Sequence, residues 1–129
     1  MIQNILLGDL CVVPIIAVDF SMGNLTFDED LSMHNADPKV VNDYRDCLKM
    51  IGHFYRNITN LAIFGYGAKT VSTQKKASEM FPLTRNIRNP FTPNSNELID
   101  EVYSSCLQAL EMAVPIRLCT IVDWFKRLG

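Results

Sequence analysis

The feature that most constrains the fold is a nearly continuous apolar run over residues 11–18, which stops at Asp19. Such a run is typical of a strand that is covered on both faces, as in a parallel or mostly parallel sheet. Turn-forming residues, among them Ser21 and Gly23, follow directly. Ligands of open α/β sheets bind at the carboxyl ends of the strands, so Asp19 lies where a site is expected.

The pair Asp19 and Ser21 has two interpretations. A carboxylate and a hydroxyl from one loop are ligands that hard cations such as Mg²⁺ prefer. Alternatively, Asp19 only ends the strand and begins a turn, as aspartate often does. The spacing alone leaves both interpretations open. Pro14 lies inside the same run, and because it lacks an N–H it belongs at an edge or at the start of a strand.

Length and composition predict one globular domain over residues 1–129. The chain has 129 residues, of which 48% are hydrophobic and 20% charged, enough for one hydrophobic core. The net charge of −2 and the scattered basic residues argue against a nucleic-acid surface. No basic region precedes the apolar run, and no stretch approaches the ~20 apolar residues of a membrane span. We therefore expect a cytoplasmic protein.

The four cysteines lie far apart and show no zinc-binding spacing. We expect all of them to be reduced core residues of an intracellular protein. They are Cys11, Cys47, Cys106 and Cys119.

Apolar residues at helical spacing predict a helix that begins just past Asp37 and Pro38 and ends near residues 57–60. In this pattern Arg45 belongs to the solvated face. A second helix is expected from a cap at Ser95.

A short buried strand is expected over residues 61–64 and a last helix over residues 116–128. Between the strand and the second helix, residues 72–96 are expected to be mostly loop, with an edge strand near residues 79–83.

No arrangement of residues argues for an enzyme. His34 and His53 are the only histidines, and neither has a nucleophile or a carboxylate at motif spacing. We expect both to be surface residues. The glycines around Tyr66 lack the spacing of a phosphate-binding loop.

Six short motifs, in their order and spacing, resemble the A domain of the copine family, a variant of the von Willebrand factor A-type fold. The similarity runs from about Ile5 to the end of the chain. The motifs are Ile16–Ser21, Leu31–His34, Phe64–Lys69, Phe81–Leu83, Asn89–Phe91 and Tyr103–Leu107.

The resemblance implies a Rossmann-like α/β domain with helices on both faces, truncated before the later strands of the family. Its implied cation site is a metal-ion-dependent adhesion site, in which Asp19 and Ser21 match the first two ligands. Gly23 and Ile116 stand where the family has further ligands, and neither offers a side-chain oxygen. The expectation is a degenerate site with at most weakly bound Mg²⁺ or Mn²⁺.

By the same resemblance, the chain is a non-catalytic protein-interaction module with unidentified protein partners. The loops at residues 65–69 and 72–96 are its expected partner surfaces. Truncation is expected to leave the first strand with an open edge. Three things could cover that edge: the last helix with Trp124 and Phe125, self-association, or another chain.

Copines also carry C2 domains that give calcium-dependent phospholipid binding. None is expected here, so direct membrane binding is not transferred to this chain. Two alternatives remain for its function. One is a substrate-recognition domain related to the copine-like ubiquitin ligases, and the other is a structural pseudodomain without a cation site.

Overall fold

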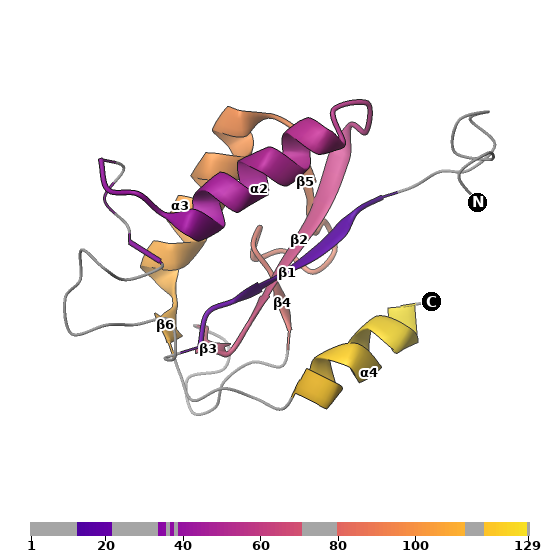
Figure 1. Ribbon diagram of the computed structural model, residues 1–129. Helices are drawn as coiled ribbons and strands as arrows, with labels where there is room; N and C mark the ends of the chain where they lie inside the picture. Colours follow the sequence, from indigo (N-terminus) through magenta and orange to yellow (C-terminus); the bar gives the residue numbers. More distant parts are fainter. Residues whose placement is uncertain are drawn as a thin grey trace.

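The computed structural model describes residues 13–21, 34–35, 37, 39–70, 80–112 and 118–128 as a mixed α/β fold. A sheet forms the centre, with helices α2 and α3 on one face and helix α4 on the other (Figure 1). This arrangement is consistent with a partial von Willebrand factor A-type fold. Gly23, Pro115, Ile116 and the acidic run at 28–30 lie outside the described residues.

Strand β2 (Asn60–Tyr66) is the centre of a four-stranded sheet. It runs parallel to β1 (Ile15–Asp19) and antiparallel to β4 (Phe81–Pro82) and β5 (Phe91–Pro93). The sheet is therefore mixed, which corrects the expectation of a parallel or mostly parallel sheet. The predicted edge strand near residues 79–83 is confirmed as β4.

A second, two-stranded sheet pairs β3 (Ala68–Lys69) with β6 (Glu111–Met112). The Nζ atom of Lys69 lies 3.4 Å from Oε1 of Glu111, across the pair. Residues 65–69 therefore belong mainly to strands, and the predicted surface loop is largely absent there. Ala68 is fully buried in this segment.

Helix α2 (Asp43–Phe54) begins later than the sequence predicts. Its N-cap is Asn42, whose Oδ1 accepts a hydrogen bond of 2.9 Å from the backbone N–H of Arg45. The carboxylate of Asp37 instead accepts from the backbone N–H of Lys39, at 2.9 Å, and forms a turn before the helix.

Helix α3 (Asn96–Ala109) begins as predicted, because Ser95 Oγ accepts a hydrogen bond of 3.3 Å from the backbone N–H of Leu98. Helix α4 (Leu118–Leu128) confirms the predicted last helix.

The two faces of β2 pack against different helices, because successive side chains of a strand alternate. Leu61 and Ile63 belong to the core that also contains Leu48 of α2 and Ile99 of α3. Phe64 points the other way, and its ring centroid lies 4.8 Å from that of Trp124 on α4. Helix α4 therefore packs on a face of the sheet and does not pair with its edge.

In the described part of the chain, β1 pairs only with β2, so its other side is an open edge. The carbonyl of Pro14 accepts from Ala62 N–H, and Phe20 N–H donates to the carbonyl of Tyr66, each at 2.9 Å. Even-numbered residues of the strand therefore face β2, and the peptide groups of Ile15 and Ala17 face outward. The missing N–H of Pro14 lies on the β2 side and does not protect the edge.

The described cysteines differ in environment. Cys106 is buried in the core, as predicted, whereas Cys47 is exposed on the outer side of α2, which corrects the prediction for that residue. Cys11 and the side chain of Cys119 fall outside the described part. Among the helices that are described, none is long and apolar enough to cross a membrane.

Candidate functional site

The candidate site lies at the carboxyl end of β1, where the structure brings Asp19 and Ser21 together. The Oδ1 atom of Asp19 accepts a hydrogen bond of 2.9 Å from the backbone N–H of Ser21. Ser21 is buried, with only 3% of its surface exposed. This contact is a local turn of the kind that aspartate forms two residues on. A turn after Asp19 is therefore present.

Tyr66 lies opposite Asp19 in the parallel register of β1 and β2. Burial raises the pKa of the Tyr66 phenol, and the nearby Asp19 carboxylate raises it further by its charge and by accepting a hydrogen bond. The phenol is thus neutral at physiological pH. Its hydrogen bond uses part of the acceptor capacity of the Asp19 carboxylate.

The position after Tyr66, Gly67, requires a glycine. Its backbone has φ of +79°, in the region that favours glycine. A Cβ placed there would also lie 3.0 Å from both the backbone nitrogen and Cβ of Ser21. The glycine therefore allows two strand ends to approach closely, a structural role for a segment that the sequence analysis treated as a partner surface.

His34 is buried beside Asp19, which corrects the prediction of a surface histidine. Its ring lies between those of Phe20 and Tyr44, with centroid distances of 4.7 Å and 4.0 Å. Its Nε2 lies 2.5 Å from the backbone carbonyl oxygen of Asp19, and its Nδ1 lies 2.6 Å from the hydroxyl of Tyr103. The prediction for His53 is confirmed, since that residue is exposed.

These contacts assign the tautomer of His34. A carbonyl oxygen only accepts, so Nε2 carries the proton and donates to Asp19. Nδ1 of the neutral ring then accepts from the hydroxyl of Tyr103. The outward carbonyl of Asp19 already accepts a hydrogen bond from His34. His34 therefore caps the open edge of β1 at its carboxyl end.

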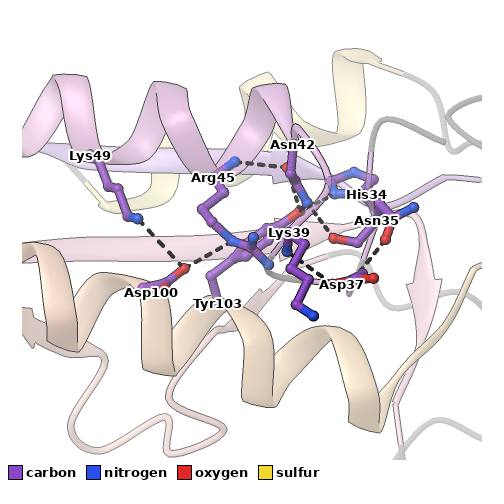
Figure 2. Close-up of polar contacts among 9 residues, drawn as sticks. All are labelled: His34, Asn35, Asp37, Lys39, Asn42, Arg45, Lys49, Asp100 and Tyr103. Carbon is purple, nitrogen blue, oxygen red and sulfur yellow. Dashed lines mark hydrogen bonds and ion pairs between the residues drawn. The ribbon is translucent and has the colours of Figure 1, made fainter. Parts of the chain in front are cut away.

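The hydrogen-bond chain continues from Tyr103 to the cap of α2 (Figure 2). Asn42 Nδ2 donates to the Tyr103 hydroxyl at 3.0 Å and to the carbonyl oxygen of Asn35 at 2.9 Å. A buried network of hydrogen bonds thus joins the tip of β1, the segment at His34, the start of α2 and the middle of α3.

The ionisable members of this network are held neutral. Burial lowers the pKa of His34, and it outweighs the opposing effects of the Asp19 hydrogen bond and charge. Burial also raises the pKa of Tyr103 to about 12. Burial therefore favours the neutral form of both side chains, and the network positions the strand tip.

The predicted cation ligands that the structure describes are Asp19 and Ser21. Across the residues that the structure describes, no group of three or more His, Cys, Asp or Glu side chains is arranged to hold a metal ion. Asp19 and Ser21 contribute a single carboxylate and a single hydroxyl. The predicted replacements Gly23 and Ile116 lie outside the described residues.

The chain folds as a mixed α/β domain. A buried network of neutral hydrogen-bonding side chains lies at the carboxyl end of its strand β1. The copine family model matches residues 32–128, well over half of the chain. The chain therefore belongs to the copine family. Membership points to a protein-interaction module, as the sequence motifs predict. The match begins after Asp19 and Ser21, so the two candidate cation ligands precede the matched segment.

The cluster of His34, Asn42 and Tyr103 was not predicted from the sequence. Two of them, His34 and Tyr103, lie in motifs that carried the family resemblance. Those motifs were the available signal, but the contact between them spans 69 positions in the sequence.

Proposed function

We propose that this chain is a non-catalytic protein-interaction module with a degenerate cation site at Asp19 and Ser21. The observation that carries the proposal is the use of Asp19 by the protein itself. Its carboxylate accepts from the backbone of Ser21 and from Tyr66, and its carbonyl accepts from His34. A carboxylate that already accepts from Ser21 and Tyr66 has less acceptor capacity left for a tightly held ion.

Mg²⁺ requires near-octahedral oxygen ligation and loses its water reluctantly. Asp19 and Ser21 offer two side-chain oxygens, so an ion held there keeps most of its water. Binding is then weak, and partner recognition proceeds without a bridging cation. The structural contacts above support this over a working adhesion site.

Thermal melts with and without millimolar Mg²⁺ or Mn²⁺ test the cation site. A ligand that binds only the native state raises stability, by about 2.7 kcal/mol at a concentration of 100 Kd and by a few tenths at or below Kd. We expect no resolvable shift in the wild type. The matched variant is Asp19→Asn, which removes the charge but keeps an oxygen that accepts from Ser21. A cation-dependent rise that this variant abolishes would contradict degeneracy.

Affinity capture with the purified chain tests the interaction module. We expect a protein partner that binds the purified chain directly and equally well in the presence of a chelator. A stable monomer with no reproducible partner would favour the structural pseudodomain instead.

The open edge of β1 favours self-association as a second mode of interaction. The peptide groups of Ile15 face outward, and 45% of the Ile15 surface is exposed. A strand from a second copy can pair there, because an edge strand presents unpaired N–H and C=O groups.

Light scattering over a range of concentrations tests this mode with two variants. Ile15→Pro removes an outward N–H without touching the ladder to β2, and Ile15→Ala removes side-chain bulk while keeping that N–H. We expect concentration-dependent dimers that Ile15→Pro weakens more than Ile15→Ala does. A monomer at all concentrations, with a cooperative melt, would exclude self-association.

A further inference from the structure

A polar pocket of about 260 Å³ lies between the start of α2 and the side of α3, and Asn42 of the buried network lines it on one side. Figure 2 shows side chains of the two helices pointing toward one another in this region. The residues that line the pocket and bear on its chemistry are Lys39, Val41, Arg45, Asp46, Lys49 and Asp100.

Arg45 forms the floor of the pocket, although the sequence pattern predicts it on the solvated face of α2. Only 7% of its side chain is exposed, and its Nε lies 2.9 Å from Oδ1 of Asp100. The N–H is not aligned with that oxygen, so the contact is ionic and Nε makes no hydrogen bond within the described structure. Nε of Arg45 and Oδ1 of Asp100 are both buried, so their ion pair closes the floor of the pocket. Lys39 is exposed and Lys49 is 34% exposed, so these two cations are open to a ligand.

The charges around the pocket favour an anionic ligand. Lys49 Nζ lies 3.9 Å from the same oxygen of Asp100 that Arg45 approaches, so two cations share one carboxylate oxygen. Lys39 adds a third cation and Asp46 a second acid. The formal charge of the lining is therefore +1, which attracts an anion of single charge and repels a cation.

The rim of the pocket also carries an exposed apolar side chain. Val41 has 75% of its surface exposed beside the three cations. A carboxylate in the pocket would meet the ammonium groups of Lys39 and Lys49, and an aliphatic neighbour of that carboxylate would cover the valine. We propose that this pocket binds an acidic side chain of a partner protein, flanked by an aliphatic residue. The proposal rests on the interaction function above and names the chemistry of the partner segment.

Backbone-amide NMR on the full chain tests the pocket, with the peptide acetyl-Leu-Glu-Leu-amide as the probe and its Leu-Gln-Leu analogue as the matched ligand. We expect the Glu peptide to shift the amides of Arg45, Lys49 and Asp100, and the Gln peptide to bind several-fold more weakly. Lys49→Gln should weaken the Glu peptide roughly two- to five-fold, the range of one exposed charge pair. Asp46→Asn should strengthen it by a similar factor, because it removes a repulsive charge.

The control variant is Lys126→Gln, which removes an exposed lysine of α4 that pairs with Asp123 at 3.7 Å. It changes the net charge equally but lies outside the pocket lining, so the affinity should not change. Equal binding of the two peptides, shifts that map elsewhere, or an equal loss in Lys126→Gln would overturn the proposal. Such a failure leaves the capture experiment unaffected, so it is distinguishable from failure of the interaction function.

Discussion

The substitution Tyr103→Phe removes one hydroxyl from the centre of the buried network and leaves the packing of its ring intact. Tyr103 is fully buried. Its hydroxyl donates to Nδ1 of His34 at 2.6 Å and accepts from Nδ2 of Asn42 at 3.0 Å. No other change to the network isolates the hydrogen bonds so cleanly from the loss of apolar contact.

The two partners of the hydroxyl are affected differently. Asn42 keeps its hydrogen bonds to Asn35 and to Arg45, so it remains largely satisfied. His34 loses the only described partner of Nδ1 while its ring stays buried. A buried acceptor left without a partner costs about 1–3 kcal/mol. We therefore expect a loss of about 1–3 kcal/mol in the free energy of unfolding.

Thermal and urea unfolding followed by circular dichroism measure this loss. For a domain of this length, each 1 kcal/mol lowers the melting temperature by roughly 3–6 °C. The matched control is Tyr55→Phe, since Tyr55 is 37% exposed and belongs to no such network. It should lie within about 0.5 kcal/mol of the wild type. Equal stability of the two variants would refute the network, as would an NMR spectrum showing the His34 proton on Nδ1.

The remaining predictions concern packing and reactivity. Gly67→Ala should destabilise the fold by about 1–3 kcal/mol, since a positive φ and the contact with Ser21 both oppose a side chain; an unchanged urea midpoint would contradict the close approach. Ser95→Ala should cost about 1 kcal/mol through the lost cap of α3, again by urea unfolding; the cap has no such role if stability is retained. Iodoacetamide should modify exposed Cys47 quickly and Cys106 only after unfolding, as mass spectrometry of native protein would show. Burial raises the pKa of Cys106 from 9.0 to about 11, so its contribution to stability is present below pH 9 and is lost as pH rises toward 11; melts of Cys106→Ala should lack that alkaline decrease.

Local patterns predicted the elements whose signals are local. The apolar run that ends at Asp19 forms β1, and the cap at Ser95 begins α3, because burial pattern and capping chemistry act over a few residues. The start of α2 was wrong because Asp37 and Asn42 are both good caps. The choice between them depends on the contacts of Asn42 with Tyr103, 61 positions away in the sequence. Strand β5 was missed because its three residues include Pro93 and acquire order only by pairing with β2.

The candidate site was predicted in part. Asp19 and Ser21 adjoin one another, so their contact follows from spacing. The burial of His34 does not, since an acidic loop gives no sign that Phe20 and Tyr44 will enclose the ring. Arg45 was placed on the solvated face because helical periodicity reports one apolar stripe and cannot show that α3 approaches from another side. The burial of His34 and Arg45 depends on contacts between elements that are far apart in the sequence.

The contact between Trp124 and Phe64 provides an optical reporter of one layer of the molecule. The chain contains a single tryptophan, and it lies on α4, against the face of β2 opposite α2 and α3. Intrinsic fluorescence therefore follows the detachment of that helix, whereas far-ultraviolet dichroism is dominated by the longer helices α2 and α3. Coincident unfolding curves from the two signals would indicate a single cooperative unit. An earlier fluorescence transition would show that the α4 layer separates while the other layer remains folded.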